Sequence, residues 1–316
     1  VWLGGNILVS PLTFLAKVKQ DDVIVLEVSS WQCESISKSE KSPDVSVITN
    51  LMHDHLNTYD GMDDYAEAKA QVFRHQTPDD VVILNADDGY GKRWIKEAPS
   101  KVLTFGKGAK NHATLKGGWI LFGSQKIFDT KKLQLLGEHN DWNAVIAALA
   151  ARQVGAGLSC IKQGLKSFKS LEHRLQPVVE KKGILFVNDT CATTPDGAVA
   201  ALHALRPKFD HLWFIMGGSD KELDYTELSK VFKKQRTRIG IFLLPGSASE
   251  KIYKELSNQQ IAVERVDDLE QAVKRAHGLA VKGDVIVLSP AAASFGQFKN
   301  EFDRGNTFIK LVQKLR

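Results

Sequence analysis

Short apolar runs rich in β-branched residues alternate with helical patterns along much of the chain. In its first half the runs are VIVLEVS (23–29), VSVIT (45–49) and VVILNADD (81–88). Each run is continuous and ends in polar or glycine-containing turns, which is typical of parallel strands buried on both faces. The first half is therefore predicted to be an α/β domain with a parallel sheet.

Residues 102–136 show a different pattern. Short runs such as ATLKG and GWILFG are separated by glycine turns, which predicts a small antiparallel β excursion. Two helices are expected after it, over roughly 141–154 and 158–168.

The alternation of strand and helix patterns restarts after the segment SLEHRLQPV (170–178). Its apolar runs are ILFVND (184–189), HLWFIMGG (211–218), RIGIFLLPG (238–246), IAVERV (261–266) and DVIVLSP (284–290). This pattern predicts a second, Rossmann-like doubly wound domain with its ligand groups at the carboxyl ends of the strands. The expected domains are 1–170 and 171–316.

Composition narrows the class of protein. The 316 residues are enough for two domains, and the net charge of +5 includes no long basic block, so no nucleic-acid partner is expected. No apolar run reaches membrane-spanning length, and the three cysteines have no CxxC spacing, which favours a soluble protein in a reducing cytoplasm. Because the chain begins at Val1 without a lead-in element, an N-terminal portion is expected to be absent.

Three polar residues of the first domain stand at positions where apolar residues or simple turns are the norm. Glu27 interrupts an apolar strand, His55 follows the next strand, and Lys69 lies on the apolar stripe of a predicted helix with Tyr65 and Phe73. Each has an ordinary explanation, respectively a salt bridge, a structural histidine and a lysine whose stem reaches to solvent. Together they favour one shared site.

The chemistry of that site depends on the lysine. A desolvated lysine has a depressed pKa, and the neutral amine can take up carbon dioxide as a carbamate. A carbamate on Lys69, with Glu27 and His55, would suit a Mg²⁺ ion that bridges phosphates. Zinc is the weaker alternative, because no cysteine is spaced to join these residues.

Several segments of the first domain resemble the central ATPase domain of the Mur ligases, the ATP-dependent amide-bond ligases of peptidoglycan precursor synthesis. The resemblance implies that Lys69 is carbamylated and that Glu27, His55 and Lys69 form the catalytic metal site. It also implies that Asn140 and Asn143 contact ATP, and that Asn6, Ser29 and Gln32 hold the sugar-peptide substrate. The segments are GGN (4–6), VLEVSSWQCE (25–34), ITNLMHDHLN (48–57), YAEAK (65–69), NADD (85–88) and LLGEHNDWN (135–143).

The second half is similar to the C-terminal domain of the same family, and most similar to its D-glutamate-adding members. The matching segments are HRLQPV (173–178), FVNDTCATTPDGAVAAL (186–202), MGGSDKELDY (216–225) and LSPAAASFGQFKNEFDRGNTF (288–308). The resemblance implies that Arg174 and Asp189 contact the nucleotide, while Thr193, Lys221 and Ser294 hold the D-glutamate carboxylates. By themselves these residues also fit a helix cap or plain turns.

The activity implied by the resemblance is the ATP-dependent addition of D-glutamate to UDP-N-acetylmuramoyl-L-alanine through an acyl phosphate. ATP and Mg²⁺ are then the cofactors, the partners are these small molecules, and a monomer is expected.

The chain departs from the family pattern in three places. No Gly-Lys-Ser/Thr phosphate loop occurs, and in the family this loop lies upstream of the GGN segment, so the fragment alone is expected to have little or no activity. Cys191 stands where the family usually has a lysine for the incoming glutamate. Glu301 and Phe302 reverse the usual order of an aromatic residue and a carboxylate.

Three other functions stay open. A sister Mur ligase or a folylpolyglutamate-synthase-like ligase would share the motifs of the first domain. A non-catalytic nucleotide-binding protein would fit the missing loop and Cys191. A nicotinamide dehydrogenase would fit the fold of the second domain, although no GxGxxG opens it.

Overall fold

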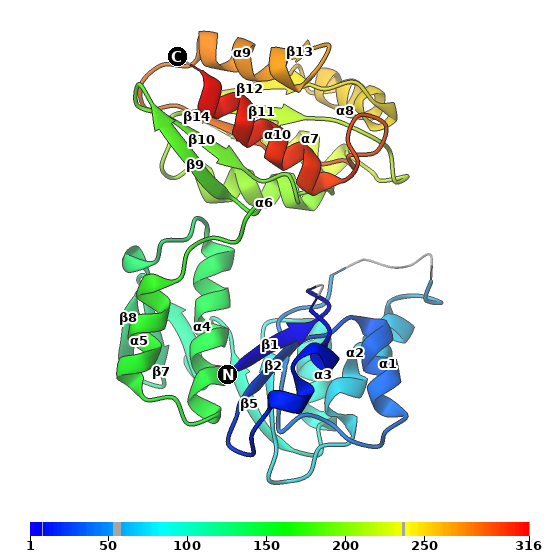
Figure 1. Cartoon of the computed structure of the whole chain (residues 1–316), viewed down its shortest axis with the longest axis vertical. Coiled ribbons are helices and arrows are strands. Elements are labelled where there is room, and N and C mark those ends of the chain that lie inside the picture. Colours follow the sequence, from blue (N-terminus) through cyan, green and yellow to red (C-terminus); the bar gives the residue numbers. More distant parts are fainter. Residues whose placement is uncertain (8, 53–57, 236–237, 316) are drawn as a thin grey trace. The chain divides into compact units, whose positions relative to one another are not determined.

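The computed structural model describes residues 1–7, 9–52, 58–235 and 238–315. These residues form two compact units, drawn in Figure 1 in colours that follow the sequence. Unit 1 consists of residues 1–133 and 141–167, and unit 2 of residues 134–140 and 168–316. The division at Ser167 and Phe168 lies near residue 170, where the sequence predicts a domain boundary, and segment 134–140 is grouped with unit 2.

Unit 1 contains a six-stranded sheet in the order β3-β4-β5-β6-β7-β8 and a separate two-stranded parallel sheet, β1-β2. Strands β3 to β6 are parallel and β6 to β8 antiparallel, which confirms the predicted antiparallel excursion. Its elements are β1 (Trp2–Gly5), η1 (Pro11–Thr13), η2 (Leu15–Lys17), β2 (Ile24–Glu27), α1 (Ser30–Ser37), β3 (Val45–Ile48), α2 (Met62–Arg74), β4 (Val81–Asn85), α3 (Gly89–Glu97), β5 (Lys101–Phe105), β6 (Ala113–Lys116), β7 (Trp119–Phe122), β8 (Gln125–Asp129), η3 (Thr130–Lys132), α4 (Glu138–Gln153, whose first residues belong to unit 2) and α5 (Leu158–Ser167).

Helices cover both faces of the six-stranded sheet. On one face α4 and α5 pack against Ile83, Leu103 and Ile120, and on the other α1, α2 and α3 pack against Val82 and Leu84. Successive residues of β4 therefore point into opposite cores, as the pleat of a strand requires.

Unit 2 contains one six-stranded sheet in the order β13-β12-β11-β14-β10-β9, in which only the β9 edge is antiparallel. This is the predicted doubly wound fold. Its elements are β9 (Gln176–Lys181), β10 (Ile184–Asn188), α6 (Pro195–Leu205), β11 (His211–Met216), α7 (Thr226–Lys233), β12 (Arg238–Leu243), α8 (Ser247–Asn258), β13 (Val263–Arg265), α9 (Leu269–Leu279), β14 (Val285–Leu288) and α10 (Glu301–Lys314).

Helices also enclose this sheet on both sides, with α6, α7 and α8 on one face and α9 and α10 on the other. The helix starts follow sequence rules, since Thr194, Asp268 and Asn300 each accept a hydrogen bond from a backbone N–H of the helix that they cap. Strand β14 lies between β10 and β11, so the loops that follow these three strands meet at one edge of the sheet.

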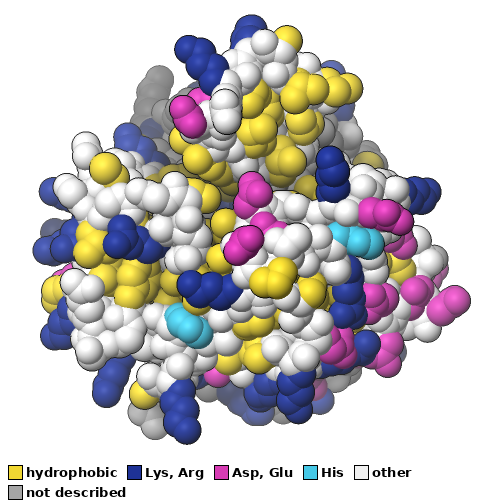
Figure 2. Space-filling model, turned by 90° about the horizontal axis from the view of Figure 1, so that it is seen from below, with side chains coloured by type: hydrophobic (Ala, Val, Ile, Leu, Met, Phe, Trp, Pro, Cys, Tyr) yellow, Lys and Arg dark blue, Asp and Glu magenta, His cyan; other side chains and the backbone are white. Residues whose placement is uncertain are grey.

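One expectation about unit 1 is wrong. The VIVLEVS run does form a parallel strand, but β2 is not buried: Ile24, Val25 and Leu26 are 40%, 48% and 43% exposed, and Glu27 is exposed as well. Within the described part of the chain β2 pairs with β1 alone and does not join the β3–β8 sheet. Apolar side chains therefore reach the surface of unit 1, and Figure 2 shows apolar side chains at the surface among charged ones.

Candidate functional site

The end of β2 brings two of the predicted residues of unit 1 together. Glu27 is the last residue of β2, and its carbonyl oxygen accepts a hydrogen bond from the backbone N–H of Asn6 at 2.7 Å. Both side chains are exposed. Gly5, with φ +100°, precedes Asn6, and a side chain there would overlap the backbone of Glu27. The GGN segment thus lies directly against the Glu27 backbone because Gly5 permits the approach.

Ser29 and Gln32 form a capping box at the start of α1. The Gln32 N–H donates to Ser29 Oγ at 3.3 Å, and the Ser29 N–H donates to Gln32 Oε1 at 2.9 Å. These two residues, predicted to bind substrate, therefore also fix the first turn of α1 beside Glu27. The S-x-x-Q spacing is a signal for this box that sequence reasoning could have used and did not.

Lys69 lies in the middle of α2 and is half-buried, with buried Tyr65, Ala66 and Phe73 on the same helix. Its Nζ is 5.1 Å from the centre of the Tyr65 ring, a cation–π arrangement. The pKa of the neighbouring buried Cys33 is raised by burial, while the charge of Lys69 lowers it and that of Glu27 raises it. Cys33 thus lies within electrostatic reach of both Lys69 and Glu27, so all three are in one neighbourhood of unit 1.

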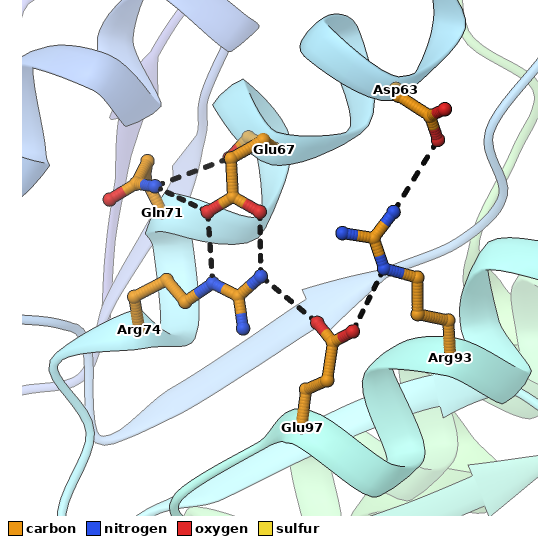
Figure 3. A network of polar contacts seen from close by, with 6 residues as sticks. All are labelled: Asp63, Glu67, Gln71, Arg74, Arg93 and Glu97. Atoms are coloured by element: carbon orange, nitrogen blue, oxygen red, sulfur yellow. Dashed lines mark hydrogen bonds and ion pairs between the residues drawn. The ribbon is translucent and has the colours of Figure 1, made fainter.

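A network of ion pairs joins α2 to α3 (Figure 3). Arg74 contacts Glu67 at 2.6 Å and Glu97 at 3.0 Å, and Arg93 contacts Glu97 at 2.8 Å and Asp63 at 3.4 Å. Glu97 thus links one arginine of each helix. Because α2 also carries Lys69, the network fixes the helix that positions this lysine.

The donor set of unit 1 is compatible with Mg²⁺. Glu27 provides an exposed carboxylate at a strand end, and a carbamate on Lys69 would add oxygen ligands of the kind that Mg²⁺ prefers. His55 lies outside the described residues. Among the residues that the structure describes, no three His, Cys, Asp or Glu side chains gather to hold a metal ion.

The two asparagines expected near ATP lie on α4. Asn140 donates its Nδ2–H to the Leu136 carbonyl at 2.8 Å, and its backbone N–H donates to the Gly137 carbonyl. Asn143 is exposed one turn later. Burial lowers the pKa of His139, which lies beside Asn140 in sequence.

In unit 2, predicted residues follow three adjacent strands at the carboxyl edge of the sheet. Lys221, after β11, donates from Nζ to Thr193 Oγ1, after β10, at 3.0 Å. The Ser219 and Ala293 backbones exchange hydrogen bonds of 2.9 and 3.1 Å, which hold the β11 loop against the β14 loop that carries Ser294. The fold therefore brings the ammonium of Lys221 to the hydroxyl of Thr193, a pair suited to a carboxylate.

Asp189 directly follows β10 and is almost completely buried. Its Oδ1 accepts a hydrogen bond from the Leu175 N–H at 3.0 Å, and its Oδ2 accepts one from Ser289 Oγ at 2.9 Å. Burial raises the pKa of Asp189 to about 7, although both hydrogen bonds and the charge of Arg174 act to lower it. Arg174, its predicted partner at the nucleotide, is exposed and lies within electrostatic reach.

The two departures of unit 2 from the family pattern lie close together. Burial raises the pKa of the Cys191 thiol, so this position has no charge at neutral pH. Glu301, which also raises the pKa of Cys191, begins α10, and its carbonyl oxygen accepts a hydrogen bond from Thr190 Oγ1. Phe302 packs edge-on against His173, with ring centres 5.5 Å apart.

Comparisons with known proteins agree with this architecture. Residues 5–151 match the Mur ligase middle domain, and residues 173–292 match the Mur ligase glutamate ligase domain. The chain is 35% identical over its whole length to the UDP-N-acetylmuramoylalanine–D-glutamate ligase of Caldanaerobacter subterraneus subsp. tengcongensis, and 36% identical to that of Borreliella afzelii. It spans 70% and 69% of these two relatives.

Solved structures share the fold. The MurF ligase of Thermotoga maritima in complex with ADP aligns with a TM-score of 0.70 and 21% identity, over 96% of this chain and 70% of that one. MurF from Acinetobacter baumannii aligns with a TM-score of 0.68 and 20% identity, over 92% of this chain and 65% of that one. The chain thus spans slightly less than two thirds of the second structure. No helix among the described residues is long and apolar enough to cross a membrane.

Proposed function

The chain belongs to the Mur ligase family, and we propose that it supplies the middle and amino-acid-binding domains of an enzyme that joins D-glutamate to UDP-N-acetylmuramoyl-L-alanine at the expense of ATP. The observation that carries this proposal is the identity of 35–36% over the whole chain to ligases of that name. The contact between Lys221 and Thr193 and the pairing of the Lys221 loop with the Ser294 loop support it, because a carboxylate-bearing amino acid needs a cation and hydroxyls.

The proposed reaction has two steps. First, the terminal alanine carboxylate attacks the γ-phosphate of ATP, which forms an acyl phosphate and releases ADP. Second, the neutral amine of D-glutamate attacks the acyl carbon, and the tetrahedral intermediate loses the amine proton to solvent and collapses to the amide and inorganic phosphate. In unit 2, Lys221 with Thr193 and Ser294 would bind and orient the D-glutamate carboxylates so that the amine faces the acyl carbon.

In unit 1, Asn6, Ser29 and Gln32 would hold the sugar-peptide substrate next to Glu27. Glu27, a carbamylated Lys69 and His55 would hold Mg²⁺, which supplies charge neutralisation at the phosphates when bound. Asn140, Asn143, Arg174 and Asp189 would contact ATP. The cytoplasmic location and the monomeric state expected from the sequence belong to the same proposal.

Two experiments test the function. The first is to read the frame that encodes the chain, in which a Gly-Lys-Ser/Thr loop is expected ahead of the GGN segment. The second assays the product of the complete reading frame with ATP, UDP-N-acetylmuramoyl-L-alanine and a panel of D- and L-amino acids, with ADP release and the ligated product measured by chromatography.

A D-glutamate-dependent product is expected, with L-glutamate as the matched control that should not react. Ligation of a different amino acid would identify a sister ligase and overturn the assigned acceptor. Binding of ATP with no ADP release and no ligated product, whatever the amino acid of the panel, would favour a non-catalytic nucleotide-binding protein.

A further inference from the structure

A fully buried arginine joins two of the loops that carry the candidate amino-acid-binding residues. Arg304, in the first turn of α10, is 1% exposed. Its Nε donates to Thr190 Oγ1 at 3.0 Å, and its Nη2 donates to the carbonyl oxygens of Thr190 at 3.0 Å and Ala292 at 3.2 Å. One side chain therefore joins the loop after β10 to the loop after β14. These are the loops that carry Thr193 and Ser294.

The charge of Arg304 has no bonded counterion in the part of the chain that the structure describes. All its hydrogen-bond acceptors there are neutral oxygens. Glu301, one turn earlier, acts on it electrostatically without a hydrogen bond. Burial lowers the pKa of Arg304 to about 10, so the guanidinium stays charged at neutral pH. A buried cation without a hydrogen-bonded anion is unfavourable, and the approach of an anion would stabilise it.

The remaining nitrogen of this guanidinium points toward the β11 loop. Nη1 donates no hydrogen bond to a described residue, and it lies 3.4 Å from where a Cβ on Gly218 would stand. Gly218 has φ +141°, and a side chain there would overlap the Ala293 carbonyl oxygen. A glycine at this position therefore leaves Arg304 close to the loop that carries Lys221.

We infer that Arg304 is a positioning residue that makes this edge of the sheet selective for an anionic amino acid. It fixes the loops of Thr193 and Ser294, and its buried charge attracts the carboxylates of the incoming molecule. The inference rests on the proposed function and deepens it.

The state of Cys191 strengthens this assignment. Cys191 is half-buried and uncharged at neutral pH, and Arg304 lies within electrostatic reach of it. Cys191, which stands where the family usually has a lysine, therefore adds no charge to this edge of the sheet. Arg304 and Arg174 are the cations that act on this position in the described structure, and Arg304 is the buried one. A buried charge is screened less than an exposed one, so it contributes more to selectivity.

The test separates the charge from the packing of the side chain. Arg304→Lys keeps the charge but loses the planar fork, whereas Arg304→Met keeps most of the volume and loses the charge. Binding of D-glutamate to the 316-residue chain and to each variant is followed by NMR titration, and the thermal midpoint of each is measured. Arg304→Met should weaken binding about tenfold or more, and Arg304→Lys about threefold or less.

Arg206→Met is the matched control. Arg206 caps the end of α6, is exposed and donates a hydrogen bond to Gln235, so its loss should leave D-glutamate binding unchanged. If Arg304→Lys and Arg304→Met weaken binding equally, in step with their thermal midpoints, the residue is only structural and the inference is wrong. If Arg304→Met does not fold, the NMR signal of the Arg304 guanidinium in ¹⁵N-arginine-labelled wild-type protein is followed instead during the D-glutamate titration. A slowly exchanging guanidinium signal that does not shift with D-glutamate would show that the inference is wrong.

A second probe distinguishes this inference from the proposed function. Glutarate carries both carboxylates of glutamate and no amine, so it cannot be ligated. Arg304-dependent glutarate binding by a protein that ligates no D-glutamate would sustain the inference and overturn the function. If an active Arg304→Met ligase has an unchanged KM for D-glutamate, the proposed function stands and the inference about Arg304 is wrong.

Discussion

The same five residues, DVIVL, occur twice in this chain, at 22–26 and at 284–288. In unit 2 they include β14, whose Val285, Ile286, Val287 and Leu288 are all 0% exposed. In unit 1 they include most of β2, in which Ile24, Val25 and Leu26 are 40–48% exposed. Strand β14 pairs with β10 and β11, and helices cover both its faces, whereas β2 pairs with β1 alone in the described structure.

The difference shows that an apolar run determines the tendency to form a strand, not its burial. Burial depends on neighbours that come from distant parts of the chain. It also explains why the two candidate sites differ. The candidate residues of unit 2 follow three adjacent strands of a sheet that helices cover on both faces, while Glu27 of unit 1 ends a strand that stands apart from the larger sheet.

The largest predicted effect tests the two DVIVL strands directly. Ile286→Ala should destabilise unit 2 by about 2–5 kcal/mol, because it leaves a cavity in a packed core. Ile24→Ala, the matched substitution in β2, should cost unit 1 less than about 1 kcal/mol, because its side chain is 40% exposed. Urea unfolding, followed by hydrogen–deuterium exchange in peptides of each unit, measures the loss of stability that each substitution causes. Equal losses would show that β2 is packed as tightly as β14.

A second prediction concerns the pH dependence of unit 2. Because burial raises the pKa of Asp189 to about 7, the folded unit binds a proton that the unfolded chain has released between about pH 4 and 7. The contribution of Asp189 to stability is therefore present at low pH and is lost as the pH rises toward 7, with a slope of at most about 1.4 kcal/mol per pH unit.

Asp189→Asn should remove this slope. The quantity to compare is the difference in unfolding free energy of unit 2 between wild type and variant, measured from pH 4 to 8. The histidines of unit 2 titrate in both proteins, so their contribution cancels in this difference. A ¹³C titration of the Asp189 carboxyl gives an independent measurement. A carboxyl that titrates near pH 4 would contradict the prediction.

The smallest effect is expected for Glu97 in unit 1, and its dependence on pH is opposite to that of Asp189. Hydrogen bonds from Arg93 and then Arg74 lower the pKa of Glu97 below its usual 4.5 (Figure 3). Its contribution is therefore present above pH 4.5 and is lost as the pH falls through the lowered pKa. Glu97→Gln should cost unit 1 about 0.5–1 kcal/mol at pH 7, because these pairs are partly exposed.

The Glu97 effect should shrink in 1 M salt, which screens exposed pairs. Glu227→Gln, which removes a single exposed pair with Lys230 on α7, is the control and should change little. An effect of Glu97→Gln that is independent of both pH and salt would mean that the network of Figure 3 acts through packing and not through charge.

Much of the architecture could be predicted from local pattern. The parallel runs, the antiparallel excursion near β6 and β7, and the doubly wound second half all follow from apolar periodicity and glycine turns, because these reflect which faces of an element meet the core. The contact of Lys221 with Thr193 and the position of Ser294 on an adjoining loop could also be predicted, since carboxyl ends of parallel strands share one edge.

Other features were not accessible in this way. Arg304 reads in sequence as an ordinary helix residue, and only the packing of α10 against two loops shows that its charge is buried. The linkage of α2 and α3 through Glu97 likewise requires side chains that are 23 residues apart in the chain.

The sequence by itself determined the order and type of most strands and helices, the residues with chemistry to offer, and the family to which they belong. Only the tertiary structure decided which apolar strand is buried, which hydroxyl meets the ammonium of Lys221 and which cation is buried without a hydrogen-bonded anion among the described residues. The physical reason is that strand tendency and capping are properties of neighbouring residues, whereas burial and charge balance depend on every group that folding brings within a few ångströms.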